Sequence, residues 1–404
     1  MIISGRTGAP DRRSEPRRLI PSGKEALTVS TTGSTLTRTQ QAPVGAQQIH
    51  IAMVAPPYFN VPPAAYGGIE TVVADLVDAL VARGHKVTLI GAGNHATRAQ
   101  RFHTTYDVGP ASQLGEAMPE IVHAAKVAGI LDALDVDVIH DHTMAGPLMA
   151  RGRLTPTVVT AHGPVHGDSG EYYRALGDTV QLIAISDAQR SSAPDLAWAA
   201  TVHNAIRSET FPFRAEKDHY ALFLGRFHPD KAPHLAIDAA RAAGLPIVLA
   251  GKCSEPVERA YFSREIEPRI GSDVTIYGVA DAAAKRRLLS HAACMLFPIC
   301  WEEPFGLVVI EAMVCGTPVV ALRRGAVPEL IVHGQTGIIV DDPDDLPLGI
   351  ALARELGPAV CRKHVEAGFT VEVMAEGYEA VYRQALTMAP EPWLTAADQA
   401  TSIR

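Results

Sequence analysis

Short apolar runs alternate with helical patterns along most of this chain. Residues 49–55 form a mostly apolar run, which predicts a buried strand. Apolar residues then recur at positions 69, 72, 73, 76, 77, 80 and 81, the spacing of one face of a helix, and residues 86–90 predict a second strand. Strand, glycine-containing loop, helix and strand make a βαβ unit, and a series of such units builds a parallel sheet.

The same alternation continues to about residue 388, with one interruption between residues 206 and 219. Further strands are expected at 137–140, 157–160, 181–185, 201–204, 220–224, 247–250, 274–277, 293–299, 319–322 and 338–340. The sequence therefore predicts an α/β protein with two Rossmann-like, doubly wound domains facing each other across a cleft. We expect a disordered tail (1–48), a first domain (49–206), a linker (207–219), a second domain (220–370), a helix returning to the first domain (371–388) and a frayed end (389–404).

Composition narrows the classes of function. Of 404 residues 47% are hydrophobic, and the net charge of −8 argues against a nucleic-acid partner. The five cysteines include no Cys-x-x-Cys pair, which predicts free thiols in a reducing compartment such as the cytoplasm. No apolar run reaches the roughly 20 residues of a membrane span, so only peripheral membrane contact stays open. Residues 1–48 hold seven Lys/Arg against three Asp/Glu and lack a signal-peptide core.

The most informative stretch follows the strand at 293–299. An acidic loop containing Glu303 leads into an apolar helix, and the backbone N–H groups at 305–307 have no helical partner, which favours an anion there. Glu311 is the one charged residue in that helix, and a buried carboxylate is costly unless a partner engages it. Glu311 is either a structural residue bonded to backbone or Arg, or a ligand-binding group.

Two other loops carry candidate anion-binding groups. Arg226 and Lys231 follow a strand and could embrace one diphosphate, although an ordinary solvated basic loop has the same composition. Gly67 and Gly68 begin the first helix and could let a phosphate approach the backbone, although a glycine pair there is more often only a turn.

Three further patterns carry weaker signals. Asp135 and Asp137 match a short Asp-x-Asp pattern, but such pairs before a strand are mostly structural. His140 and His142 share one face of a strand without a third metal ligand, which favours a substrate-facing pair or core polar residues over a metal site. Glu303 and Glu311 need not flank one bond, so a glycosidase pair is disfavoured. The chain has neither a P-loop nor a Gly-x-Gly-x-x-Gly fingerprint.

In this order, the motifs resemble those of the retaining glycosyltransferases of family 4, which have the GT-B fold. The resemblance spans about residues 49–388 and rests on five motifs: Tyr66-Gly-Gly-Ile-Glu70, Gly225-Arg226-x4-Lys231, Glu303-x7-Glu311, Gly325-Ala-Val-Pro-Glu329 and His333-Gly-Gln-Thr-Gly337.

The resemblance implies a first domain that binds the acceptor, a second that binds the donor, and a role for each matching residue. Arg226 and Lys231 would hold the donor diphosphate, Glu303 a hydroxyl of the donor sugar, and Glu311 the ribose. His162 would lie beside the donor sugar. The backbone N–H groups of Gly67 and Gly68 would meet the donor diphosphate or the acceptor, and the backbone of Phe305, Gly306 and Leu307 would hold sugar and phosphate. The loops at Gly251 and Val279 would border the base.

The implied reaction moves a hexose from a UDP-, GDP- or ADP-sugar to an unknown hydroxyl acceptor by same-face substitution, without metal or cofactor. Two alternatives stay open on the same fold: a catalytically silent sugar-nucleotide-binding protein, and a phosphorylase or epimerase. Three positions depart from the family pattern. Ala232 and Ala326 each replace a glycine, which we expect to be harmless, and Asn204-Ala-Ile-Arg207 replaces a more usual Asn-Gly-x-Asp, which bears on hinge contacts.

Overall fold

A computed structural model describes residues 47–64 and 67–388. The expectations for the two tails, other than Gln47 and Gln48, and for Tyr66 lie outside the described residues. The domain boundaries given above stay predictions.

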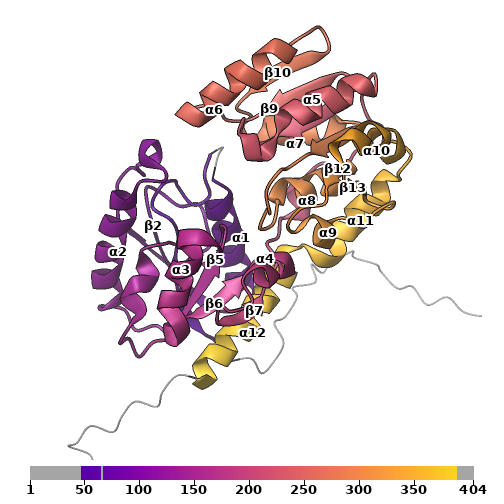
Figure 1. Cartoon of the computed structure of the whole chain (residues 1–404). Coiled ribbons are helices and arrows are strands. Elements are labelled where there is room, and N and C mark those ends of the chain that lie inside the picture. Colours follow the sequence, from indigo (N-terminus) through magenta and orange to yellow (C-terminus); the bar gives the residue numbers. More distant parts are fainter. Residues whose placement is uncertain (1–46, 65–66, 389–404) are drawn as a thin grey trace, which may run out of the picture. The chain divides into compact units, whose positions relative to one another are not determined.

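The first sheet has seven parallel strands in the order β3-β2-β1-β4-β5-β6-β7. They are β1 (His50–Val54), β2 (Lys86–Gly91), β3 (Arg101–Thr104), β4 (Val138–Asp141), β5 (Thr157–Ala161), β6 (Gln181–Ala184) and β7 (Trp198–Thr201). Helices α1 (Gly68–Ala82), α2 (Ala117–Leu131), α3 (Gly167–Leu176) and α4 (Asp187–Ser192) connect them (Figure 1). The apolar pattern alone does not predict β3, α2 or α3, whose faces are largely exposed.

The second sheet has six parallel strands in the order β10-β9-β8-β11-β12-β13. They are β8 (Ala221–Leu224), β9 (Ile247–Ala250), β10 (Val274–Gly278), β11 (Cys294–Phe297), β12 (Val319–Leu322) and β13 (Gly337–Val340). Its helices are α5 (Pro233–Ala242), α6 (Pro256–Tyr261), α7 (Ala282–His291), α8 (Leu307–Val314), α9 (Val327–Leu330), α10 (Leu346–Ala353) and α11 (Pro358–Gly368). Two parallel sheets with crossover helices confirm the predicted α/β class and its two Rossmann-like domains.

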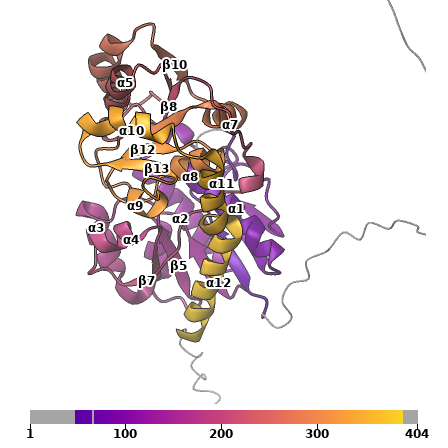
Figure 2. The ribbon, with the colours of Figure 1, turned by 90° about the vertical axis from the view of Figure 1, so that its right-hand side faces the viewer.

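The last helix, α12 (Val371–Met388), belongs to the core of the first sheet although it follows the second in sequence. Tyr378 and Tyr382 are fully buried there among residues of α1 and the strands, and Figure 2 shows α12 beside α1. Glu379 of α12 accepts hydrogen bonds from Arg83 and Arg383. Burial alone raises the pKa of Glu379, but these arginines outweigh it and hold the pKa at about 2.

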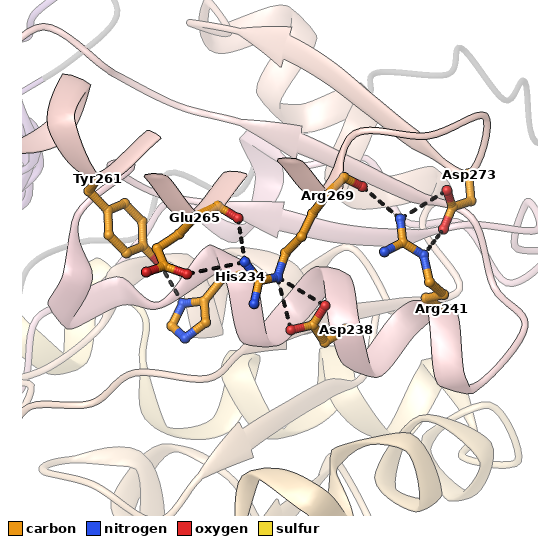
Figure 3. Close-up of polar contacts among 7 residues, drawn as sticks. All are labelled: His234, Asp238, Arg241, Tyr261, Glu265, Arg269 and Asp273. Carbon is orange, nitrogen blue, oxygen red and sulfur yellow. Dashed lines mark hydrogen bonds and ion pairs between the residues drawn. The ribbon is translucent and has the colours of Figure 1, made fainter. Parts of the chain in front are cut away.

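A network of ion pairs fastens the segment between β9 and β10 to helix α5 (Figure 3). Arg269 bridges Asp238 of α5 and Glu265, at 3.0 and 3.1 Å. Arg241 of α5 bonds Asp273 through two nitrogens, and His234 meets the Tyr261 hydroxyl at 2.5 Å (Figure 3). The network holds α6 and the π-turn that follows it, and α6 carries a carboxylate that reaches the site described next.

Candidate functional site

Two adjoining cavities lie at the carboxyl ends of the strands, where parallel sheets bind ligands. The larger has a volume of about 410 Å³ and the smaller about 250 Å³; the residues that line both are Gly68, Val72, Glu303, Gly306 and Leu307. All the candidate site residues line one or both cavities: Gly67, Gly68, Arg226, Lys231, Gly251, Val279, Glu303, Gly306, Leu307 and Glu311 line the larger, and His162 and Phe305 line the smaller. The fold thus brings together residues up to about 240 positions apart in sequence.

Lys231 and Glu303 form an ion pair inside the larger cavity. Trp301 completes the unit: its indole N–H donates to the Glu303 carboxylate at 2.8 Å, and its ring lies 5.0 Å from the Lys231 nitrogen. The side chains of Lys231 and Glu303 are only 18% and 13% exposed, so solvent screens the pair weakly. The sequence pattern does not identify Trp301, because nothing in its spacing distinguishes it from a packing residue.

Arg226 is held by two carboxylates of the segment that carries α6. Its Nη1 lies 3.6 Å from Glu255 and 3.5 Å from Glu258. Glu258 is fully buried, and its other oxygen accepts the backbone N–H groups of Ser254 and Glu255. Arg226 itself lines the larger cavity, so these contacts hold its guanidinium at the cavity wall. The two glutamates sit in a region of chain that has no strand or motif signal, so sequence reasoning missed them.

Glu311 has a cationic partner that sequence reasoning also missed. Lys285 of α7 approaches the buried Glu311 carboxylate at 2.5 Å, and both side chains line the larger cavity. The charge that makes Glu311 expensive in an apolar helix is therefore compensated. The partner is a lysine on a neighbouring helix, rather than the backbone group or arginine of the structural interpretation. The ribose role of Glu311 stays a prediction.

Glycine shapes the start of α8. Gly306 has φ of 94° in the left-handed region, and a Cβ there would lie 3.1 Å from the Phe297 ring. The helix begins at Leu307 with no side-chain cap, and the N–H of Val309 bonds the carbonyl of Gly306. The N–H groups of Leu307 and Val308 have no hydrogen-bond partner among the described residues, and both residues line the larger cavity. This arrangement suits an anionic group, because N–H groups and the helix dipole both favour negative charge.

The small cavity contains a paired histidine. His162 Nε2 lies 2.8 Å from His142 Nδ1, and His142 Nε2 lies 3.1 Å from the sulfur of Met53. Burial lowers the pKa of His162 to about 4, and burial together with the two neighbouring histidines holds the pKa of His142 well below its usual range. Both imidazoles are therefore neutral at pH 7.

His140 and Asn204 occupy different environments beside this pair. His140 is a core polar residue bonded to Tyr382 and Thr160, so of the pair considered in the sequence only His142 contacts a cavity residue. Asn204 lines the small cavity, and its buried Oδ1 has no partner within the described residues.

The structure corrects one expectation about the departures from the family pattern. Ala232 has φ of 47°, a left-handed conformation that costs an alanine about 1–2 kcal/mol, so replacing the usual glycine there is not neutral. Ala326 has φ of −74° and needs no glycine. Arg207 makes two ion pairs with α1, to Asp75 at 2.6 Å and Asp78 at 2.7 Å.

Two parallel sheets with a cationic, glycine-rimmed cavity at their carboxyl edge define the GT-B class of glycosyltransferases. The sequence models described as "Glycosyl transferases group 1" and "Glycosyltransferase Family 4" match residues 207–356 and 66–222. The chain therefore belongs to the family 4 (group 1) glycosyltransferases, which confirms both the resemblance and the enzyme class.

Individual relatives agree with this assignment. The phosphatidyl-myo-inositol mannosyltransferase of Mycobacterium leprae is 26% identical over 363 residues, which cover 79% of this chain and 91% of that protein. AviGT4, a glycosyltransferase involved in avilamycin A biosynthesis, is 27% identical with a TM-score of 0.64, over 84% of this chain and 99% of that one. Anabaena HepE, solved with UDP and glucose, is 18% identical with a TM-score of 0.66, over 83% and 100% of the two chains, and shares the fold.

Within residues 47–64 and 67–388, every helix is too short or too polar to cross a lipid bilayer.

Proposed function

We propose that this glycosyltransferase moves a hexose from a nucleotide-diphosphate sugar to a hydroxyl acceptor with retention of configuration. The observation that carries the proposal is the larger cavity. It combines Arg226, Lys231 and the uncapped start of α8, which suit a diphosphate, with the carboxylates Glu303 and Glu311, which suit sugar and ribose hydroxyls.

In this proposal the donor replaces ion pairs that the protein makes with itself. The diphosphate takes Lys231 from Glu303 and engages Arg226, while Glu303 becomes free to accept from a sugar hydroxyl. Glu311 accepts from the ribose hydroxyls beside Lys285. Backbone groups of Gly67, Gly68, Phe305, Gly306 and Leu307 contact diphosphate and sugar, and the loops at Gly251 and Val279 border a uracil, guanine or adenine base.

The chemistry requires stabilisation of the leaving nucleotide diphosphate as negative charge grows on it. Arg226, Lys231 and the start of α8 supply that stabilisation, so the proposal needs neither a metal nor another cofactor. The carboxylates among the residues that line the two cavities are Glu303 and Glu311, each paired with a lysine. This arrangement favours same-face substitution, in which the leaving phosphate oxygen takes the proton of the acceptor hydroxyl, over attack by a protein nucleophile.

The acceptor and the cellular setting belong to the same proposal. One relative is named for phosphatidyl-myo-inositol and another for the biosynthesis of avilamycin A, two different kinds of molecule. We expect the first half of the chain to bind a hydroxyl acceptor rather than a nucleic acid. We also expect a cytoplasmic enzyme that reaches membranes at most peripherally.

Release of free nucleotide from a panel of donors tests the proposal. The purified protein is incubated with UDP-glucose, UDP-GlcNAc, GDP-mannose and ADP-glucose, with and without acceptor extracts, in buffer containing EDTA. Nucleotide release that depends on an extract supports the transferase. Donor binding without release supports the silent protein, sugar release that needs inorganic phosphate supports a phosphorylase, and donor interconversion without an acceptor supports an epimerase.

A further inference from the structure

Histidine pairing in the small cavity determines which kind of hydrogen bond the site offers there. A thioether sulfur has no hydrogen to donate, so the 3.1 Å contact with Met53 requires the proton of His142 to be on Nε2. Because a neutral imidazole carries one N–H, His142 Nδ1 then has only a lone pair. That lone pair lies 2.8 Å from His162 Nε2, which must therefore be the donor.

This protonation state determines what the second ring nitrogen of His162, Nδ1, can bind. With its proton on Nε2, neutral His162 presents a bare Nδ1 lone pair, and this atom has no hydrogen-bond partner within the described part of the chain. His162 lines the small cavity beside Glu303 and Gly306. The cavity therefore offers an acceptor at this point.

The neighbouring residue His140 also holds the His142–His162 pair in place. The His140 ring packs against His142 with centroids 4.0 Å apart and planes tilted by 40°, and His140 is fixed by Tyr382 of α12 at 2.7 Å and by Thr160 at 2.8 Å. Thr160 in turn meets the Tyr378 hydroxyl at 2.9 Å. Among residues 47–64 and 67–388, no carboxylate bonds either ring of the His142–His162 pair, so no ion pair with these residues stabilises an imidazolium.

We propose that His142, oriented by Met53, is a positioning residue that sets His162 as a neutral hydrogen-bond acceptor, and that the site thereby selects a sugar presenting an O–H rather than a carboxylate or carbonyl at that point. The oxygens of a carboxylate there would place their lone pairs against the lone pair of His162 Nδ1. The carboxylate would also lose its hydrogen bonds to water without gaining a donor from the protein. The proposal rests on the proposed function only for the identity of the ligand. The tautomer itself is a property of the free protein.

The tautomer is measured without any substrate. In 15N-histidine-labelled protein at pH 7, long-range 1H–15N spectra distinguish a protonated from a bare ring nitrogen, and His162→Gln assigns the signals. We expect His162 to carry its proton on Nε2 and to remain neutral when the pH falls to 5. A proton on Nδ1, or an imidazolium at pH 7, would overturn the proposal whether or not any donor is turned over.

Kinetics then test the positioning role. His142→Phe removes the lone pair that holds His162, whereas the amide oxygen of His142→Asn can still accept from His162 Nε2. We expect His142→Phe to raise KM for the donor and lower kcat/KM about tenfold, the size of one hydrogen bond, and His142→Asn to recover most of that loss. His123→Phe is the matched control, because His123 is equally buried in the same half, bonds Thr105 and lines neither cavity.

Two kinetic results would contradict the role of His142. One is a loss in His142→Phe no larger than that in His123→Phe; the other is His142→Asn behaving like His142→Phe. Deoxyfluoro analogues of the accepted donor test whether His162 accepts or donates the hydrogen bond, because fluorine cannot donate one. At the sugar position that depends on His162, the deoxyfluoro donor should be turned over no faster than the deoxy donor, because neither can donate and the fluorine lone pairs oppose that of Nδ1. Better turnover of the fluoro donor would mean that His162 donates.

Discussion

Replacing Lys231 with methionine tests whether the cationic cavity carries the reaction. Methionine keeps an unbranched stem over the Trp301 ring but removes the charge, which lies within contact of Glu303 and 5.0 Å from the ring centre. The fold should tolerate the change. Glu303 keeps the hydrogen bond from Trp301, so we expect a stability loss of only about 1–2 kcal/mol for its unpaired charge.

The effect on turnover should be much larger. Two unit charges about 4 Å apart interact by about 4 kcal/mol at an effective dielectric constant of about 20, which suits a side chain that is only 18% exposed. Only the part of this energy that grows as the diphosphate leaves lowers the barrier. Removing one such stabilising group typically costs about 3–4 kcal/mol, so kcat should fall by about 100- to 1,000-fold.

The assay is initial-rate release of nucleotide with saturating donor, after circular dichroism has shown that the variant is folded. Lys126→Met is the matched control, because Lys126 also lies over an aromatic ring, 4.7 Å from the centre of Tyr106, but outside both cavities. Its rate should equal that of the wild type. A Lys231→Met enzyme within threefold of the wild type, or a control that falls equally, would refute the assignment of the leaving-group site.

Three other changes have expected outcomes that follow from single contacts. Lys285→Met should lower the free energy of unfolding in urea by about 2–3 kcal/mol, because it leaves the buried Glu311 charge without its partner. The double variant Lys285→Met/Glu311→Gln should recover part of that loss, and additive effects of the two substitutions would contradict the pairing. Gly306→Ala should cut kcat/KM at least tenfold, because the added Cβ pushes the start of α8 off the Phe297 ring. Gly334→Ala is the control: Gly334 has a similarly positive φ but open space around it, so this variant should lose about 1 kcal/mol of stability and no activity. Equal activities of the two variants would refute this explanation. For Glu379 the folded pKa of about 2 lies below the ordinary 4.5, so its stabilisation is present above pH 4.5 and is lost as the pH falls from 4.5 to 2. Glu379→Gln should therefore lower the free energy of unfolding by about 2 kcal/mol at pH 7 and by little at pH 2. The value at pH 7 is smaller than the pKa shift alone implies, because the side chains of Arg83 and Arg383 are about a third exposed and solvent screens them. An equal loss at both pH values would show that the charge of Glu379 is unimportant.

Much of this protein follows from its sequence. Periodicity places most strands and the helices with a continuous apolar face, such as α1, because burial on one side leaves a regular trace. It fails for α2 and α3, whose exposed positions are mixed with apolar ones, and for the short strand β3 at the sheet edge. Many of the candidate site residues can also be predicted from sequence, because the loop that follows a parallel strand lies at the carboxyl edge of the sheet, where ligands bind.

What the tertiary structure decided is the partner of each charge. The sequence identified Glu311 as a carboxylate in need of a partner, but that partner, Lys285, lies on another helix. Likewise, Glu258 contacts Arg226 from a segment in which the sequence shows no strand or motif. The tautomer of His162 depends on a sulfur atom more than 100 positions away, and the strain at Ala232 depends on a backbone angle. Local sequence determines which groups face the ligand edge, whereas pairing depends on distances between elements that only the packed fold sets.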